Sequence, residues 1–568
     1  MPAVRVATVQ YAVGQDVGDN LAKCLRFIDL ACAPAEGPKP ALILLPELCN
    51  HPSRYRGQEH AYEVALSIPG PFVDAVSARA RAHGAHIAMS ATVKGPQPRV
   101  FDTTILIGPD GRIIGTHEKQ YLFGHETECI SIGRTPGRVF ETAVGRIGLY
   151  ICQEGLIPET SRCLAVEGAQ ILLNPLNSGG PDEGALHVPA RAAENHFWVV
   201  SANNVGPIPG GHARNYVGGS EIVDPSGRVV AHASETEEEV VYATIVPEQA
   251  DDKRIGRDND LLADRRPELY GLVTATNDEV PVCTLPADEI LPRARVSAVQ
   301  VSFDGDVSRT LERTLAAIRE VASGGTRIVV LPELSPFDRG RVAADPAGSS
   351  RASAEALARL CGLARDAGIY IVASLVEAEG GRYFSTAYLA GPAGEVIGKY
   401  RQVHLWSSER RWATPGSDFP VFPTPYGRMG MLIGYDGLMP EAARILALKG
   451  ADIIAFPCAW RVEWEPRLGV IERAAENRVC LIAAARADSD IARGSMIIQA
   501  DRFPCFPHWW IRSPIPAECA PGNGAHVSAG LAAIYARDKR DYDKTDQVRN
   551  RRPEFYAALL RAPERRPA

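Results

Sequence analysis

The sequence lacks the cysteine spacings that build metal sites and disulfide frameworks. Its 568 residues include 12 cysteines, but no two of them form a Cys-x-x-Cys motif or a paired Cys/His zinc spacing. Cysteines scattered over a chain of this length are typical of small buried side chains in a reducing compartment. We therefore expect neither a bound metal nor a disulfide framework.

Three further features are missing: a long apolar run, a secretory leader and an excess of positive charge. No apolar stretch approaches the length of a membrane span, and the chain enters an alternating strand directly at Val4. The net charge is −7 and the isoelectric point is about 6.1. These absences predict a cytoplasmic protein with no membrane partner and no nucleic-acid partner.

The chain contains the same set of motifs twice. LPEL at Glu47 returns as LPEL at Glu333, which is 286 residues later, and RAAEN returns after 282 residues. The segments GRIGLYICQEGLIPE and GRMGMLIGYDGLMPE also match, with Gly434 standing opposite Cys152. A nearly constant offset over separate blocks indicates that a whole domain is duplicated.

The repeat predicts two domains, residues 1–285 and 286–568, and each alternates strands with helices. In the first half we expect strands Val4–Gln10, Ala41–Leu48 and His86–Val93, a helix Pro71–His83 and a hairpin Phe101–Gly115. In the second half we expect strands Val296–Val301, Arg327–Leu334 and Ile369–Val376, with helices Val307–Val321 and Ala352–Ala367. Strands outnumber what one parallel sheet needs, so the predicted fold class is α/β, as two tandem four-layer α-β-β-α sandwiches.

Three residues of the first half follow strands and bring complementary chemistry. Glu47 follows an apolar strand, Lys119 follows the hairpin, and Cys152 follows the strand that ends near Ile151. The ends of strands in a layered α/β fold face a shared crevice. There the carboxylate would take the thiol proton, the thiolate would attack a carbonyl or nitrile carbon, and the ammonium would stabilise the developing anion. The backbone N–H of Gln153 is a candidate second donor to that anion.

These motifs resemble the carbon–nitrogen hydrolase (nitrilase) superfamily, and the resemblance covers both halves in order. It rests on LPEL, on the lysine in GTHEKQYL, on GLYICQEGLIPE and on RAAENHFWVVSANNVG. The resemblance implies a Glu–Lys–Cys triad at Glu47, Lys119 and Cys152, the sandwich fold, hydrolysis of non-peptide C–N bonds, no cofactor and dimer-based assembly. Many members carry a second active-site glutamate after the lysine; Glu126 is the better match, and Glu128 is its competitor.

The second half keeps the scaffold motifs but not the chemistry. Glu333 is retained, whereas Gln402 stands in place of the lysine and Gly434 in place of the cysteine. Glycine offers no nucleophile, and glutamine carries no full positive charge. Cys458 could point into the same region, but it would lack a paired base and ammonium. We therefore interpret the second half as a non-catalytic pseudoenzyme domain that serves as a tethered partner of the first, an intrachain pseudo-dimer, with further homo-oligomers left open.

The leading functional hypothesis is an amidase: an amide plus water would give an acid plus ammonia, through a thioester at Cys152. Glu154 and Gly155 after the cysteine look closer to the pattern of simple amidases than to the Cys-Trp-Glu of nitrilases. A nitrilase, an N-carbamoyl hydrolase, an acyl transferase and a non-catalytic scaffold stay open as alternatives. The substrate would be a small amide or nitrile.

Overall fold

The computed structural model describes residues 3–209, 214–256, 258–286, 290–499, 502–505, 508–511 and 514–563. The chain forms two compact units. Unit 1 consists of Met1–Lys253 and Arg540–Leu559, and unit 2 consists of Arg254–Lys539 and Leu560–Ala568. Each unit therefore includes a segment that the sequence repeat assigns to the other half, and the boundaries 1–285 and 286–568 stay a prediction about the duplication.

Unit 1 contains two six-stranded mixed sheets. The first has the order β14 (Glu239–Ile245), β1 (Val4–Gln10), β2 (Leu42–Leu44), β3 (His86–Lys94), β4 (Val100–Ile107) and β5 (Ile113–Glu118). The second has the order β13 (Val229–His232), β12 (Glu221–Val223), β9 (Trp198–Ala202), β8 (Ile171–Pro175), β7 (Gly145–Leu149) and β6 (Val139–Thr142). In each sheet three central strands run parallel, and these place their carboxyl ends along one edge.

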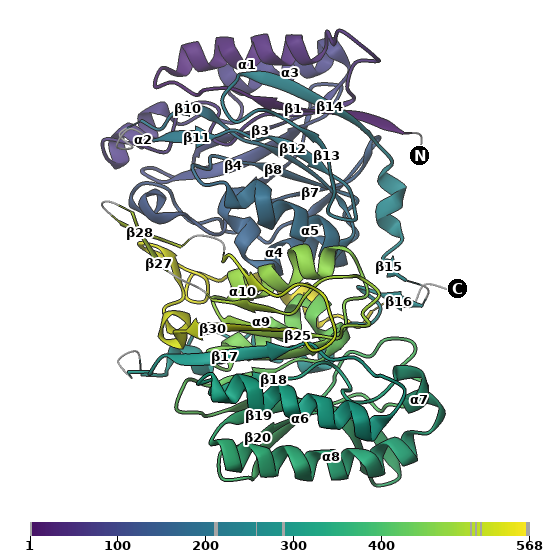
Figure 1. Ribbon diagram of the computed structural model, residues 1–568. Helices are drawn as coiled ribbons and strands as arrows, with labels where there is room; N and C mark the ends of the chain where they lie inside the picture. The colour runs from purple at the N-terminus through teal and green to yellow at the C-terminus, as the bar shows by residue number, and fades with distance from the viewer. Residues whose placement is uncertain are drawn as a thin grey trace. The chain divides into compact units, whose positions relative to one another are not determined.

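The two sheets of unit 1 pack face to face with helices outside. Apolar side chains from both sheets, among them Val6, Leu44, Ile147 and Leu173, form one core between them. A second core joins the outer face of the first sheet to helices α1 (Val17–Ala31) and α3 (Pro71–His83), which lie together on that face in Figure 1. Helices α4 (Pro158–Val166) and α5 (Val188–Asn195) belong to the other side, and α5 packs against β9. This is the predicted α-β-β-α arrangement.

Unit 2 repeats these layers, which confirms the predicted fold class for both copies. Its sheets have the orders β21-β20-β19-β18-β17-β30 and β22-β23-β24-β25-β26-β29. The strands are β17 (Ala294–Val299), β18 (Ile328–Val330), β19 (Tyr370–Glu379), β20 (Arg382–Ala390), β21 (Val396–Arg401), β22 (Val421–Phe422), β23 (Met429–Met431), β24 (Ile453–Cys458), β25 (Cys480–Ala485), β26 (Met496–Ile498), β29 (Ala517–Glu518) and β30 (His526–Leu531). The helices are α6 (Val307–Ser323), α7 (Arg339–Ala344), α8 (Pro346–Ala367), α9 (Pro440–Leu448) and α10 (Val470–Asn477).

Short elements complete the chain. They are α2 (Gln58–Val64) and the strand pairs β10 (Val205–Pro207) with β11 (Asn215–Val217), β15 (Arg254–Ile255) with β16 (Asn259–Asp260), β27 (Arg502–Cys505) with β28 (His508–Ile511), and β31 (Arg540–Tyr542) with β32 (Thr545–Asp546). None of the helices in the described part of the chain combines the length and apolar composition that a bilayer crossing needs.

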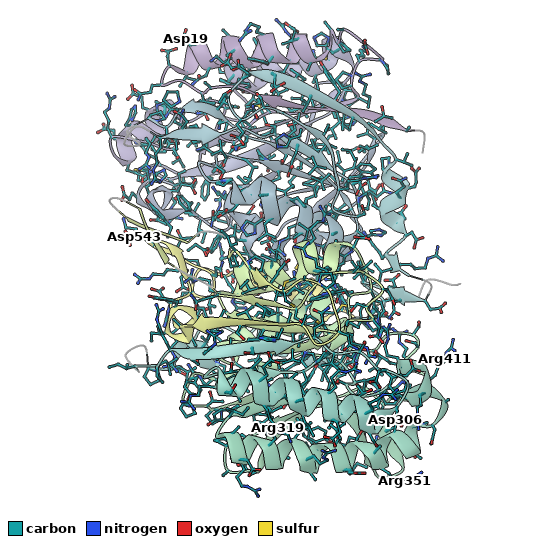
Figure 2. The ribbon with its side chains drawn as sticks, viewed as in Figure 1. Asp19, Asp306, Arg319, Arg351, Arg411 and Asp543 are labelled. Atoms are coloured by element: carbon teal, nitrogen blue, oxygen red, sulfur yellow. The ribbon has the colours of Figure 1, made fainter. Side chains whose placement is uncertain are left out.

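Local sequence signals explain where the helices begin and end. The Asp16 side chain accepts a hydrogen bond from the Asp19 N–H at the start of α1, and Pro71 opens α3. Gly84 ends α3 in the left-handed conformation, with φ of 63°. Charged side chains lie on the outward faces of the outer helices, as Figure 2 shows for Arg319 on α6 and Arg351 on α8. The apolar faces are thereby left to the cores.

Several predicted bounds differ from the observed ones, and the difference around Glu47 bears on the site. The predicted strand Ala41–Leu48 is hydrogen-bonded as a strand only over Leu42–Leu44. After it the chain turns, and Leu48 has φ of 55°, in the left-handed region. Glu47 therefore lies in a turn beyond the end of the strand, and its side chain does not follow the alternation of strand residues.

Candidate active site

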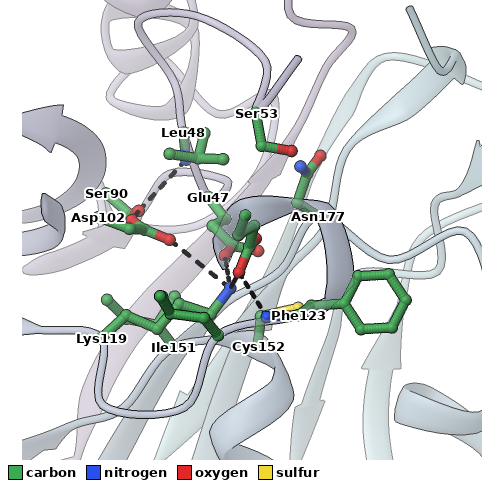
Figure 3. A network of polar contacts seen from close by, with 12 residues as sticks. Glu47, Leu48, Ser53, Ser90, Asp102, Lys119, Phe123, Ile151, Cys152 and Asn177 are labelled. Atoms are coloured by element: carbon green, nitrogen blue, oxygen red, sulfur yellow. Dashed lines mark hydrogen bonds and ion pairs between the residues drawn. The ribbon is translucent and has the colours of Figure 1, made fainter. Parts of the chain in front are cut away.

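The three predicted residues meet at the carboxyl ends of the strands of unit 1. Glu47 lies in the turn after β2, Lys119 directly follows β5, and Cys152 opens a short 3₁₀ helix, η2 (Cys152–Leu156), after β7. Both sheets contribute, because β2 and β5 belong to the first sheet and β7 to the second. Figure 3 shows the three side chains converging on one place. The structure therefore brings together groups that are widely separated in the sequence.

The Lys119 ammonium is the centre of this cluster. Its Nζ donates to Glu47 Oε1 at 2.6 Å and to Glu126 Oε1 at 2.9 Å, and it lies 3.7 Å from Asp102 Oδ2. All four side chains are buried. Oxygens of the three carboxyls lie within 4.8 Å of one another, a spacing that could hold a metal ion. In unit 1 the Lys119 ammonium supplies the positive charge among them.

The electrostatics of the cluster follow from three buried carboxyl groups around one cation. Burial raises the pKa of Glu47 well above its usual value; Lys119 lowers it, and Asp102 and Glu126 raise it. Burial also raises the pKa of Asp102. For Lys119, burial acts to lower the pKa, but Glu126 and Glu47 raise it well above the ordinary value, so the ammonium stays charged. Because the carboxylates would outweigh this single charge, the cluster favours holding at least one extra proton.

The backbone conformation at Cys152 places its thiol next to the cluster. Cys152 has φ of 49°, and its N–H donates to Asn174 Oδ1 at 2.9 Å. Burial raises the pKa of the Cys152 thiol, Glu47 raises it further and Lys119 lowers it. The resting group is therefore a thiol whose proton has to pass to a base. Gln153 is the second residue of η2, where backbone N–H groups have no acceptor within the helix.

Of the two candidate glutamates after the lysine, Glu126 faces the cluster. It is 4 % exposed and bonds Lys119, and its other oxygen accepts the Phe123 N–H at 2.8 Å. Glu128 is exposed and pairs with Lys544 at 2.8 Å. The geometry thus favours Glu126 as the second active-site glutamate.

The segment that bears Glu126 is held by the C-terminal part of unit 1. The Gly124 N–H donates to Thr545 Oγ1 at 2.6 Å, and the Phe123 ring stacks on Tyr542 with centroids 4.6 Å apart. Arg552 Nη1 also donates to the carbonyl oxygen of Gly133 at 2.6 Å. Residues 540–559 therefore support the turn that positions Glu126, although the repeat assigns them to the second half.

In unit 2 the equivalent place contains a different ion-pair cluster. Arg461 Nη2 lies 2.9 Å from both Glu333 Oε1 and Glu409 Oε1. Gln402 Nε2 donates to Glu409 Oε2 at 2.8 Å, so Gln402 takes the place of Lys119 without its charge. The Arg461 guanidinium also stacks over Trp406, 4.8 Å from the ring centroid. An arginine from another segment thus supplies the cation that the missing lysine does not.

The geometry of unit 2 does not support a nucleophile at Gly434 or at Cys458. A Cβ atom built on Gly434 would lie 2.6 Å from Glu333 Oε2, so a cysteine does not fit there without movement. Cys458 is buried, and its Sγ bonds the Ala484 carbonyl oxygen at 3.3 Å. Its thiol is directed to the backbone of β25, as expected for a core cysteine.

Replacing Arg461 with alanine should destabilise the protein by about 3–5 kcal/mol, because two buried carboxyls lose their counter-charge. Burial raises the pKa of Glu409 to about 8 although Arg461 lowers it, against an ordinary value of 4.5. Between pH 4.5 and about 8 the folded state binds more protons than the unfolded chain, so the unfolding free energy falls as pH rises. Without Arg461 this fall should be steeper, so the loss of stability caused by the substitution should grow with pH. Denaturant unfolding at several pH values measures this. Arg411→Ala, which removes an exposed arginine of the same unit, is the matched control; equal stabilities of the two variants would contradict the prediction.

Three residues of these clusters were not predicted from the sequence: Asp102, Glu409 and Arg461. The sequence held a signal for Asp102, because RVFDTTIL in the first copy matches RYFSTAYL in the second and places Asp102 opposite Ser385. The backbone N–H groups of Lys119 and Gln402 agree with this match, since they bond the carbonyls of Asp102 and Ser385, each at 2.9 Å. Asp102 is thus a third polar difference besides the lysine and the cysteine. Arg461 had no such signal, since it lies in a loop where the copies do not align by motif.

Comparison with known proteins relates both copies to one family. The family model described as carbon-nitrogen hydrolase matches residues 5–254 and again residues 295–510. A protein named nitrilase from Pyrococcus abyssi is 35% identical over 248 residues, which cover 42% of this chain and 89% of that protein. The human omega-amidase NIT2 is 30% identical over 213 residues, covering 35% of this chain and 76% of the relative.

Two solved structures are also similar to part of this chain. Nit3 of Saccharomyces cerevisiae, a member of the nitrilase superfamily, is 27% identical with a TM-score of 0.39, covering 44% of this chain and 92% of that one. An amidase from Nesterenkonia sp. is 24% identical with a TM-score of 0.38, covering 44% and 93%. Each match spans less than half of this chain and nearly all of the solved one.

Proposed function

Because the chain belongs to the carbon-nitrogen hydrolase family, we propose that it hydrolyses a small amide through a thioester on Cys152. The observation that carries the proposal is the buried Lys119 ammonium, which bonds Glu47 at 2.6 Å, with both groups acting on the Cys152 thiol. A thiol, a base and a fixed cation are the groups that acyl transfer needs.

The first half of the reaction forms the thioester. Glu47 takes the thiol proton while Cys152 Sγ bonds to the amide carbon, and the carbonyl oxygen becomes an anion that Lys119 and the Gln153 N–H stabilise. When the tetrahedral intermediate collapses, the C–N bond breaks and the nitrogen leaves as ammonia with the proton held by Glu47. The products of this half are the acyl enzyme and one ammonia.

The second half releases the acid. Water attacks the thioester carbon, and a carboxylate of the cluster, Glu47 or Glu126, takes its proton. The C–S bond then breaks and the thiol recovers its proton. Overall one amide and one water give one acid and one ammonia, with no oxidant and no cofactor in the balance.

A nitrile is the second candidate substrate, supported by the 35% identity to a protein named nitrilase. The same thiol would add to the nitrile carbon and form a thioimidate, which water converts to an acid and ammonia. An N-carbamoyl compound would also yield ammonia from the same centre. The amide has the advantage of Glu154 and Gly155 after the nucleophile.

We also propose that the second copy does no chemistry. Supporting this are Gly434 at the nucleophile position, Gln402 at the lysine position and Arg461 bound to both carboxylates of the equivalent place. Its C-terminal segment, residues 540–559, gives it a role in support of the first copy.

The test of the function is ammonia release from a panel of small amides, nitriles and N-carbamoyl compounds, with the acid product identified in each case. The proposal predicts release from at least one amide, with acid and ammonia in equal amounts. Ammonia with an amide or ester product from an added amine or alcohol would instead indicate an acyl transferase. No release from any member of the panel would count against the hydrolase.

Deleting residues 540–568 should lower turnover by about 10²-fold, because a small displacement of a positioned group costs that much and the Glu126 turn loses Thr545 and Tyr542. The matched control deletes only residues 564–568, which should leave turnover unchanged. Turnover per folded molecule is the quantity to compare. Full turnover after the longer deletion would show that this segment does not support the site.

A further inference from the structure

Asp102 is a buried carboxyl beside the candidate active site that the reaction as proposed does not use. It lies in β4 with no exposed surface, and its Oδ1 accepts a hydrogen bond from Ser90 Oγ at 2.7 Å. Its Oδ2 lies 3.7 Å from the Lys119 ammonium, and a dashed line marks this contact in Figure 3. Among the described residues, neither Asp102 Oδ2 nor Glu47 Oε2 has a hydrogen-bond partner. The Glu47 and Asp102 carboxyls interact with each other, and this contact raises the pKa of Glu47 and lowers that of Asp102.

Asp102 is not needed to build the turn that bears the glutamate. In unit 1 the Leu48 N–H donates to Ser90 Oγ at 3.2 Å, which links the turn to Asp102. The second copy has Ser385 in place of Asp102, yet Leu334 keeps φ of 48°, close to the 55° of Leu48. The same turn therefore forms without the aspartate.

The loss of the aspartate in the second copy accompanies the loss of the lysine and the thiol. There Ser374 stands opposite Ser90 and Ser385 opposite Asp102. Neither hydroxyl has a hydrogen-bond partner among the described residues, so no other group has taken over the contact between Ser90 and Asp102. The aspartate is present in the copy that has Lys119 and Cys152 and absent from the copy that lacks both, and the turn forms without it. We therefore connect Asp102 with the chemistry of the site.

We propose that Asp102 is a positioning residue that holds one proton jointly with Glu47 and so sets the pH range in which Glu47 accepts the Cys152 proton. The inference rests on the proposed function, because it assigns Asp102 a role in that same thiol activation. It goes beyond the triad and Glu126, since Asp102 acts only through Glu47.

The proton balance explains what the pair contributes. In the acid form the joint proton resides on Glu47, beside the Asp102 carboxylate, and Glu47 cannot act as a base. Once this proton is lost, Glu47 takes the Cys152 proton and shares it with Asp102, while the new thiolate faces the Lys119 ammonium. No proton enters or leaves the cluster in the transfer itself, and the Asp102 charge sets the pH at which Glu47 is free to accept.

The groups that face the pair determine the sign of the expected effect. Around Glu47 and Asp102 the charged or titratable side chains are Lys119, Glu126, Cys152, Tyr216, Tyr55, Cys49 and His117. Burial raises the pKa of Glu47 most, and among the side chains Asp102 raises it further. Replacing Asp102 with asparagine removes that charge and keeps an oxygen for Ser90, so Glu47 should ionise at lower pH.

The experiment is the rate of alkylation of Cys152 by iodoacetamide as a function of pH, in the full chain, over the range in which the protein stays folded. In the natural protein we expect an acid limb that reports ionisation of Glu47. In Asp102→Asn this limb should move to lower pH; a shift of one pH unit equals a rate difference of about tenfold on the acid side. Asp102→Ser, which copies the second half of the chain, should move it in the same direction and serves if the asparagine variant does not fold. Ser385→Asn is the matched control and should leave the limb in place.

The outcomes separate this inference from the function on which it rests. A limb that keeps its midpoint in both Asp102 variants, even with a lower plateau, would show a purely structural role and overturn the inference while leaving the thiol mechanism standing. If the natural protein shows no acid limb and no preferred alkylation at Cys152, the proposed function itself fails.

Discussion

Replacing Cys152 with alanine should abolish ammonia release while leaving the protein folded. The side chain is small and 7 % exposed, so the substitution removes little packing, and the unfolding free energy should change by only about 1 kcal/mol. Turnover should fall by about 10⁴-fold or more, as when the nucleophile of a catalytic triad is removed. Cys152→Ser should also lose most of the activity, because a hydroxyl is a far weaker nucleophile than a thiol in this setting.

The second copy offers a matched control for this variant. Cys458 is a buried cysteine at a strand end, as Cys152 is, but its Sγ contacts the Ala484 carbonyl. Cys458→Ala should keep full turnover. The assignment of the nucleophile to Cys152 would be wrong if Cys152→Ala kept appreciable activity, or if only Cys458→Ala lost activity.

Replacing Lys119 with glutamine should lower kcat by about 10²–10³-fold, the cost of removing one donor to a developing oxyanion. This variant repeats in the first copy what Gln402 already is in the second. The change also removes a cation that lowers the pKa of Glu47 and of Asp102, so these two carboxyls should bind protons more tightly and the variant should lose stability as pH rises. Activity per folded molecule at the lower end of the folded pH range is therefore the quantity to compare.

The reciprocal variant is the control for Lys119. Gln402→Lys should create no activity, because Gly434 offers no thiol and Arg461 already binds Glu333 and Glu409. A near-normal kcat in Lys119→Gln would show that the Lys119 ammonium does not stabilise the oxyanion.

Much of this architecture could be predicted from the sequence. The shared LPEL, GLxPE and RAAEN blocks predicted the duplication, and the strand pattern together with the family resemblance predicted the sandwich fold. The positions of Glu47, Lys119 and Cys152 after strands, with the same resemblance, predicted that the three side chains meet. The choice between Glu126 and Glu128 could not be predicted, since both lie within one short turn. Only the direction of that turn puts Glu126 on Lys119 and leaves Glu128 to Lys544.

Two features depended on packing that sequence spacing does not encode. Both copies end in similar tails, DRRPELY and NRRPEFY, so nothing in the letters says which unit each tail joins. Residues 540–559 lie in unit 1, where they support the Glu126 turn. Arg461 likewise reaches Glu333 and Glu409 from a loop, and an arginine in a loop is usually expected at the surface.

Mass spectrometry of the protein trapped with a slowly released amide substrate tests the central claim most directly. The account predicts one acyl group per chain, bound to the peptide that contains Cys152 and to none of the peptides with the other cysteines. The adduct should disappear on incubation in water as the acid product accumulates. An acyl group on any other residue, or turnover with no adduct at Cys152 under conditions that trap the intermediate, would contradict the account.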